Sequence, residues 1–233
     1  MEDGAKIHDV IGRAFYVDGT AGDGVNINGT ISNITGDKDM WQGQNGAAIH
    51  LRGGAVAHLN GDLRENPNSG KIEGIQTSGT SAVFMVGSEF YMNAGSSIRN
   101  CGDGVKGIFE FGNIGNYLEM DGEITGIQKD NAININVENS SKPDVQPLIC
   151  KIGPNGDIHD NSVKNGAIYM QTVDGVLDIY GKIRDNHNDT MDTSSGGLYM
   201  AHNHRHSTVT MYEGAEISNN TALKYGGLIV SKG

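Results

Sequence analysis

The sequence predicts an all-β fold, a right-handed single-stranded parallel β-helix (a solenoid) of about seven rungs. Three observations support this prediction. Two short apolar phrases alternate strictly seven times along the 233 residues. The apolar residues within each phrase lie two positions apart, which is the period of a β-strand, and helical periodicity is absent from residue 25 onward. Thirty-five glycines and abundant asparagine indicate many tight turns between short strands.

The first phrase consists of an apolar-x-apolar pair, a glycine, an aliphatic residue and a nearby asparagine, as in VNINGTISN and LDIYGKIRDN. The aliphatic residues recur on average about 31 positions apart. Each rung can bury its apolar side only against its neighbours, so we expect the six isoleucines of this set to stack in one inward column. The complete set is Ile31, Leu63, Ile98, Ile124, Ile158, Ile183 and Ile217.

The second phrase is a small residue followed by an apolar-x-apolar pair, as in AAIHL and GGLYM. It predicts a second inward column. In the third rung the pattern slips by one residue, because Glu110 cannot face the core whereas Phe109 and Phe111 can. The first apolar residues of the phrase are Ile49, Val83, Ile108, Ile133, Ile168, Leu198 and Leu228.

Asparagines recur just after the aliphatic residues of the first phrase. Asparagine tolerates the left-handed backbone conformation, and its amide can bond to the same group one rung away. We therefore expect structural turn ladders at Asn33, Asn66, Asn100, Asn161, Asn186 and Asn219.

Residues 1–24 form an N-terminal cap or a partial rung in front of the β-helix domain of residues 25–233. Apolar residues in this segment follow helical spacing at Ile7, Val10, Ile11, Ala14 and Phe15, which favours a short capping helix. The alternative is an early strand through Ala14–Val17. The chain ends with GGLIVSKG directly after an apolar strand, and we expect it to be a fragment of a longer protein.

The composition excludes several classes of partner. The formal net charge is −11, and the 17 basic residues form no cluster, so we expect no nucleic-acid partner. No stretch has the apolar length of a membrane span, so we expect no direct membrane insertion. Cys101 and Cys150 lie two rungs apart, farther than a disulfide can reach, and we expect them to be unbridged.

The phrases GAIYM, GGLYM and GGLIV, together with EISNNTA, resemble repeats of polymorphic outer-membrane and adhesin-type β-helix proteins. Similar repeats occur in large wall-attached proteins of gut Gram-positive bacteria. The resemblance covers roughly residues 25–230 and implies a secreted or cell-surface bacterial protein with further domains. It also implies an extracellular adhesion module that recognises a host protein, such as an immunoglobulin, or a glycan.

The middle residue of each second phrase must face outward, because its two apolar neighbours face the core. Tyr169 and Tyr199 then lie side by side on adjacent rungs and offer a stacking surface to a ligand. The expected binding residues are His50, Phe84, Asn134, Tyr169 and Tyr199.

Two segments have weak metal-ligating character. His202, His204 and His206 alternate and could present imidazoles on one side of a strand, but Arg205 opposes a bound cation. The acidic loop 185–192 has oxygen side chains suited to calcium, but it lacks the glycine and the closing glutamate of an EF-hand. We therefore expect no cofactor, with calcium as a weak alternative.

The alternative function is a polysaccharide lyase or glycoside hydrolase. Such enzymes place carboxylates with basic partners on one outer sheet. The candidates are Asp157, Asp160 and Asp185, with His159 and Arg184 as partners. However, Asp160 and Asp185 occupy turn positions where asparagine stands in other rungs, which favours binding over catalysis.

Overall fold

The computed structural model describes residues 1–19, 24–36, 46–61, 70–77, 81–102, 107–112, 115–137, 147–172, 174–189, 195–201 and 206–231. Within these ranges every regular element is a β-strand. No helix occurs in them, and hence none that could cross a membrane. The described chain is all-β, as predicted.

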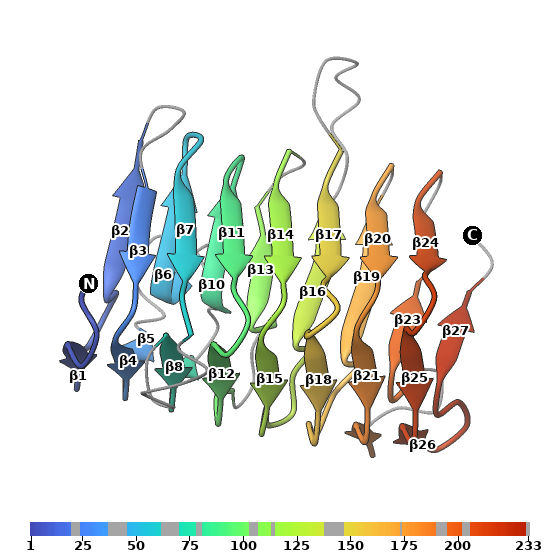
Figure 1. Cartoon of the computed structure of the whole chain (residues 1–233). Helices are drawn as coiled ribbons and strands as arrows, with labels where there is room; N and C mark the ends of the chain where they lie inside the picture. The colour runs from blue at the N-terminus through green and yellow to red at the C-terminus, as the bar shows by residue number, and fades with distance from the viewer. Residues whose placement is uncertain are drawn as a thin grey trace.

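Three large sheets, which we call sheets I, II and III, contain most of the strands (Figure 1). Sheet I has eight strands in the order β1 (Lys6–His8), β4 (Thr30–Ser32), β8 (Lys71–Glu73), β12 (Ser97–Arg99), β15 (Glu123–Thr125), β18 (Asp157–His159), β21 (Lys182–Arg184) and β25 (Glu216–Ser218). Sheet II has eight, in the order β2 (Phe15–Asp18), β6 (Gly46–Arg52), β10 (Ser81–Val86), β13 (Phe109–Phe111), β16 (Ile133–Val137), β19 (Ile168–Thr172), β23 (Leu198–Met200) and β27 (Leu228–Val230).

Sheet III has seven strands, in the order β3 (Gly24–Ile27), β7 (Val56–Leu59), β11 (Glu89–Met92), β14 (Tyr117–Met120), β17 (Ile149–Ile152), β20 (Val176–Ile179) and β24 (Thr208–Met211). Two short pairs complete the fold, β5 (Thr35–Gly36) with β9 (Gln76–Thr77), and β22 (His187–Asn188) with β26 (Thr221–Ala222).

The strands of all sheets pair in parallel. From β1 to β27 the chain visits sheets I, II and III in the same rotation, so each strand pairs with its counterpart one repeat away. Figure 1 shows these counterparts side by side from the N-terminal to the C-terminal end. Parallel partners need a long connection, and here that connection is the rest of the repeat. The arrangement is consistent with a parallel β-helix.

The predicted isoleucine column is present at the middle position of sheet I. The six predicted isoleucines lie in it, and five of them are completely buried, while Ile217 on the last strand is half-buried. Each fully buried side chain contributes about 1.5–3 kcal/mol of transfer free energy. Leu63 lies outside the described residues, and Ile72 occupies the second-repeat position between Ile31 and Ile98. Ile7 extends the column at its N-terminal end.

The second predicted column is present in sheet II. Its paired members are Ile49, Val83, Phe109, Ile133, Ile168, Leu198 and Leu228. Phe109 pairs with both Val83 and Ile133, so the predicted one-residue slip in the third repeat is confirmed. Phe111 is also buried.

The prediction of an N-terminal capping helix is wrong. Residues Lys6–His8 and Phe15–Asp18 are strands, and they pair with β4 and β6. Ile7 aligns with Ile31 and Phe15 with Ile49, so the segment is a partial repeat that continues both apolar columns. Helical spacing over so few residues is also compatible with two short strands, and edge pairing with the first full repeat favours the strands.

The turn ladders form, but at two adjacent positions. Left-handed backbone with φ near +54° occurs at Asn33, Asn100 and Asn219 as predicted, and also at Asp160 and Asp185. At Asn161 and Asn186 the predicted amide contact between rungs is confirmed, because Asn161 Nδ2 donates to Asn186 Oδ1. The predicted left-handed conformation is wrong there, because both residues lie one position after the turn residue and are buried. Asn66 lies outside the described residues.

Cys101 and Cys150 are both free and buried. Cys150 belongs to the inner face of sheet III, where it pairs with Leu118 and Leu177. Burial raises the pKa of both thiols above the usual range, so neither is a reactive thiolate at neutral pH.

Candidate functional site

The predicted binding column lies on the outer side of sheet II, in the expected register. In the structure this outer column also includes Tyr16, Glu110 and Ile229. From β2 to β27 it consists of Tyr16, His50, Phe84, Glu110, Asn134, Tyr169, Tyr199 and Ile229. The expectation that the whole column is exposed is wrong. His50, Phe84 and Asn134 are 7%, 2% and 9% exposed, so little of each can reach a ligand.

Neighbouring rings contribute to this burial. The ring centroid of His50 lies 5.0 Å from that of Tyr16 and 5.1 Å from that of Phe84. Burial, with Arg13 and Arg52 nearby, lowers the pKa of His50 to about 4. His50 is therefore neutral at physiological pH and acts as a packing residue.

Tyr169 and Tyr199 are adjacent, as expected. They pair in register on β19 and β23, and both are half-buried. Their rings meet edge to face, with centroids 5.6 Å apart and an interplanar angle of 68°. The hydroxyl of Tyr169 donates a short hydrogen bond to Gln171. Of the five expected binding residues, these two tyrosines are the ones that remain accessible to a ligand.

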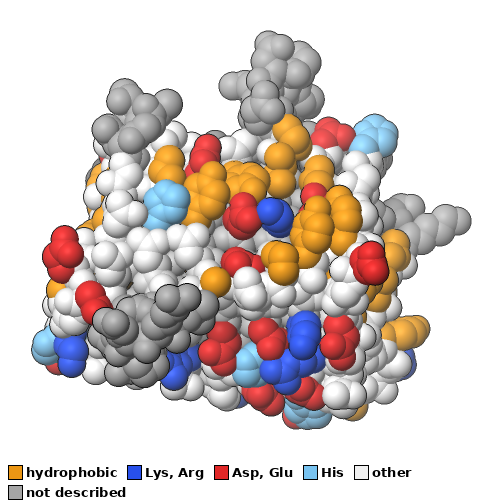
Figure 2. Space-filling view, in the orientation of Figure 1, with side chains coloured by type: hydrophobic (Ala, Val, Ile, Leu, Met, Phe, Trp, Pro, Cys, Tyr) orange, Lys and Arg blue, Asp and Glu red, His pale blue; other side chains and the backbone are white. Residues whose placement is uncertain are grey.

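A larger aromatic surface, which the sequence analysis missed, covers the outer side of sheet III. We call it the sheet III face. Along β7, β11, β14, β17 and β20, half-exposed and buried residues alternate. Figure 2 shows its apolar side chains spread across the strands, with charged groups among them. Its main residues are Val56, His58, Glu89, Tyr91, Tyr117, Glu119, Ile149, Lys151, Val176, Asp178, Tyr180 and Tyr212. The sequence contained the pattern for this face, because these residues lie between or next to the apolar residues of the first phrase.

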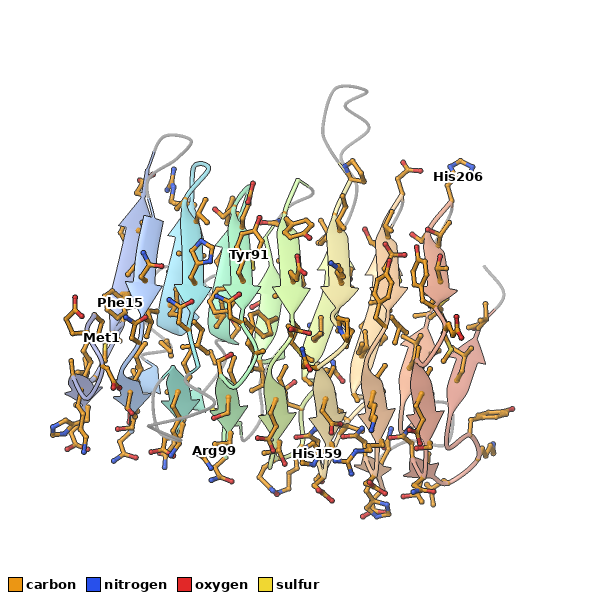
Figure 3. All side chains as sticks on the ribbon, in the orientation of Figure 1. Met1, Phe15, Tyr91, Arg99, His159 and His206 are labelled. Atoms are coloured by element: carbon orange, nitrogen blue, oxygen red, sulfur yellow. The ribbon has the colours of Figure 1, made fainter. Side chains whose placement is uncertain are left out.

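Aromatic rings on this face form ladders between strands. Tyr180 and Tyr212 stack with centroids 4.0 Å apart and an interplanar angle of 8°. His58 and Tyr91 stack at 4.8 Å and 13°, and Tyr117 lies 5.4 Å from Tyr91 (Tyr91 is labelled in Figure 3). In-register pairing places like side chains next to one another, so the sheet itself holds the rings in place.

The centre of the face is charged. Lys151 Nζ donates to Glu119 Oε1 at 2.8 Å, and the Tyr117 hydroxyl donates to Glu119 Oε2 at 2.7 Å. Although partial burial opposes it, these two hydrogen bonds hold the pKa of Glu119 below its usual value. Tyr91 donates in the same way to Glu89 at 2.7 Å, and burial together with this bond raises the pKa of Tyr91 to about 12.

The candidate catalytic residues come together on the outer side of sheet I. His159 contacts Glu123 at 2.8 Å and Asp160 at 2.7 Å, one carboxylate at each ring nitrogen (His159 is labelled in Figure 3). The Arg184 guanidinium donates to Asp157 and to Asp185, at 2.8 Å each.

Each carboxylate of this cluster contacts either the Arg184 guanidinium or the His159 imidazole. The hydrogen bond from Arg184 to Asp157 is the main cause of a raised Arg184 pKa, which keeps the guanidinium charged. A catalytic pair needs one carboxyl group free to give a proton and another free to take one or to attack. The arrangement is that of a surface ion-pair network.

The metal candidates are not assembled in the described part of the chain. His202 and His204 lie outside it, as do residues 190–192 of the acidic loop. His206 is highly exposed and pairs with Asp174 at 3.3 Å (His206 is labelled in Figure 3). Asp185 contacts Arg184, and Asp189 contacts His187 at 2.6 Å. No group of three or more metal-ligating side chains occurs among the described residues.

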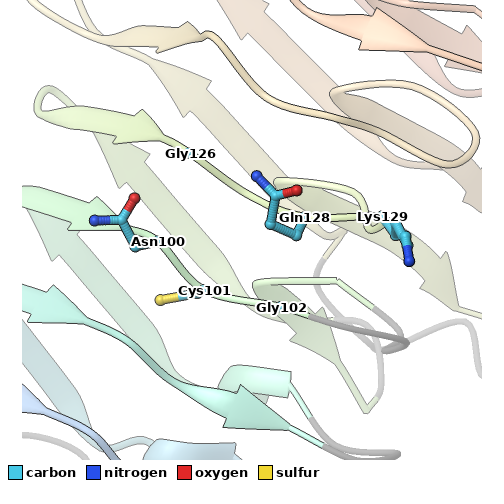
Figure 4. Close-up of a pocket in the computed structure, with 6 residues that line it drawn as sticks. All are labelled: Asn100, Cys101, Gly102, Gly126, Gln128 and Lys129. Carbon is cyan, nitrogen blue, oxygen red and sulfur yellow. The ribbon is translucent and has the colours of Figure 1, made fainter.

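A shallow pocket of about 330 Å³ lies between the turns that follow β12 and β15 (Figure 4). It is lined by Asn100, Cys101, Gly102, Gly126, Gln128 and Lys129. Burial raises the pKa of the Cys101 thiol to about 12, so the thiol is not a nucleophile at neutral pH. The lining contains no carboxyl or imidazole group, and its one charged side chain is Lys129.

No family model matches the chain, and neither a curated protein nor a solved structure shows significant similarity to it.

Proposed function

We propose that this chain is a right-handed parallel β-helix of about seven rungs that serves as an extracellular binding module on a bacterial surface. Its partner is a host protein or glycan. Right-handedness follows from the preference of crossovers between parallel strands of one sheet. The sheet III face is the main contact surface, and the Tyr169–Tyr199 pair on sheet II is a second one.

The observation that carries the proposal is the row of half-exposed rings on the sheet III face. Tyrosine is enriched at protein interfaces because its ring buries a large area and its hydroxyl keeps a polar contact. Tyr91 and Tyr117 project from the neighbouring strands β11 and β14, and Tyr180 directly follows β20 of the same sheet. Side chains held by a rigid sheet and by one another lose little conformational entropy on binding.

The charge network on sheet I supports the alternative, a polysaccharide-active enzyme, more weakly. The network brings Asp157, His159 and Arg184 together, but each of these groups already contacts an oppositely charged or imidazole partner. Release of reducing or unsaturated sugar ends from acidic and neutral polysaccharides would support the enzyme. Loss of that release in Asp157→Asn would assign it to this network.

A two-stage experiment tests the binding proposal. The chain is first screened against glycan arrays and host secretory proteins, including immunoglobulins. For a captured ligand, Tyr91→Ala and Tyr117→Ala are each expected to weaken binding by about 1–3 kcal/mol. Tyr169→Ala and Tyr199→Ala report on the second surface in the same assay.

The melting temperature of each variant separates loss of contact from loss of fold. If all four variants bind normally while folded, both aromatic surfaces are excluded as the contact. If the sheet II pair alone matters, the assignment of the main contact to sheet III is wrong.

A further inference from the structure

The stacking on the sheet III face limits which ligands it can bind. A sugar ring stacks on an open aromatic face, but several faces here are covered by the next ring. Tyr180 and Tyr212 lie 4.0 Å apart and nearly parallel, and His58 and Tyr91 cover each other at 4.8 Å. Each stacked ring therefore has one face covered by its neighbour, which leaves less open ring for a sugar and suits lateral packing against the side chains of a polypeptide.

The polar groups of the face are mostly hydrogen-bond acceptors. The hydroxyl groups of Tyr91 and Tyr117 already donate to Glu89 and Glu119. The Tyr212 hydroxyl donates to Asp178 at 3.3 Å. Besides the His58 imidazole and the Tyr180 hydroxyl, the face offers a ligand chiefly carboxylate oxygen, which accepts hydrogen bonds but cannot donate them when ionised.

The charged groups of the face are also mostly acidic. Among its described residues, Glu89, Glu119 and Asp178 are acidic, whereas Lys151 is basic and is bound to Glu119. Asp178 pairs in register with Lys151 on the next strand. The whole chain carries a formal net charge of −11, which attracts cations at long range.

An apolar row runs beside the charged one. Tyr117, Ile149 and Val176 pair in register across β14, β17 and β20, and all three are half-exposed. The charged row of Glu119, Lys151 and Asp178 lies two residues further along the same strands. Strands in one sheet lie about 4.8 Å apart, and successive side chains of an extended peptide point in opposite directions. A short extended peptide that lies between the two rows can therefore direct alternate side chains toward each row.

We propose that the partner of the sheet III face is a cationic polypeptide segment in which arginine or lysine alternates with apolar residues. The cations contact Glu89, Glu119 and Asp178, and the apolar side chains pack on Tyr117, Ile149 and Val176. This inference rests on the proposed function and names the chemistry of the partner.

The test uses synthetic peptides as probes of the intact chain. An eight-residue peptide of alternating arginine and valine is compared with one of alternating glutamate and valine, and with a neutral cello-oligosaccharide. We expect binding of the arginine peptide, weakened by added salt because exposed charges are screened. Asp178→Asn is expected to weaken that binding by about two- to fivefold.

Lys151→Gln gives an expectation of opposite sign. It removes the competing cation and releases Glu119, so binding of the arginine peptide should strengthen by about two- to fivefold. A variant that merely damaged the sheet would weaken binding instead. Glu123→Gln, on sheet I, is the control for Asp178→Asn: it removes one negative charge away from the face and should leave binding unchanged.

Three results would overturn the inference: no binding of the arginine peptide, equal binding of the glutamate peptide, or weaker binding in Lys151→Gln. If the oligosaccharide binds instead and Tyr117→Ala abolishes its binding, the face is a binding surface with a glycan partner. The proposed function then stands while the inference fails. If Glu123→Gln weakens binding as much as Asp178→Asn, the attraction belongs to the net charge and not to this face.

Discussion

Asn161 and Asn186 lie on neighbouring repeats with their side-chain amides in direct contact. Asn161 Nδ2 donates to Asn186 Oδ1 at 2.8 Å, and Asn186 Nδ2 donates to Asn220 Oδ1 at 2.9 Å. Asn186 Nδ2 also reaches the carbonyl oxygen of Ile158 at 2.9 Å. Both Asn161 and Asn186 are buried, so this chain of amides satisfies polar groups that water cannot reach.

Asn186→Ala should be strongly destabilising for this reason. It removes the acceptor of one Asn161 amide N–H and the side-chain donor to the Ile158 carbonyl, at about 1–3 kcal/mol for each buried group left unsatisfied. Asn93→Ala removes an exposed asparagine whose amide donates to Asn60 one repeat away, and it should lower the unfolding free energy much less. Urea denaturation of both variants measures the difference. Equal losses of unfolding free energy would contradict a special structural role for the buried asparagines.

Ile124→Ala tests the isoleucine column. Ile124 is completely buried between Ile98 and Ile158, so truncation leaves a cavity and should lower the unfolding free energy by about 2–5 kcal/mol. Ile11 is 81% exposed, and Ile11→Ala is the matched control with a change within about 0.5 kcal/mol. A small effect in Ile124→Ala would mean that the column is not packed as the structure shows.

His50 should make stability decrease at acidic pH. Burial lowers its pKa from 6.5 to about 4, so between these values the unfolded chain binds a proton that the folded chain does not. The unfolding free energy should therefore fall as pH falls through this window, by up to roughly 1.4 kcal/mol per pH unit. Chemical denaturation from pH 4 to 8 should show a shallower slope in His50→Gln. His206→Gln, at a highly exposed position, should retain the slope of the parent chain.

Asp130 should have the opposite effect. Burial raises its pKa from 3.8 to about 7, and its Oδ2 atom is buried without a hydrogen-bond partner. Between these values the folded chain binds a proton that the unfolded chain releases, so stability should fall as pH rises through the window. Asp130→Asn should remove this pH dependence, and its unfolding free energy should exceed that of the parent chain most at pH 8. Asp160→Asn, at an exposed turn, is the control; a parallel pH profile for Asp130→Asn and the parent chain would contradict the assignment.

The strands, their parallel pairing and most of the two inward columns could be predicted from the sequence. Alternation of apolar residues states which side of a strand faces the core, and the repeat states which strands are neighbours. The slip at Phe109 was predictable because Glu110 has a charge that the core cannot accept. These features depend on residues close in sequence or one repeat apart.

Other features required the tertiary structure. Pattern identifies the outer side of a strand, but whether a residue there is exposed depends on the groups that pack over it. Phe84 and Tyr199 share one outward column, yet Phe84 is buried and Tyr199 is half-exposed. The structure also places Ile72 in the isoleucine column and makes a strand at Phe15. In both places, pairing with the strand of the next repeat outweighs the short local sequence pattern. The same holds for the sheet III face. The sequence pattern predicts that its residues point outward, but their ring stacking and ion pairs form only when the repeats pair in register.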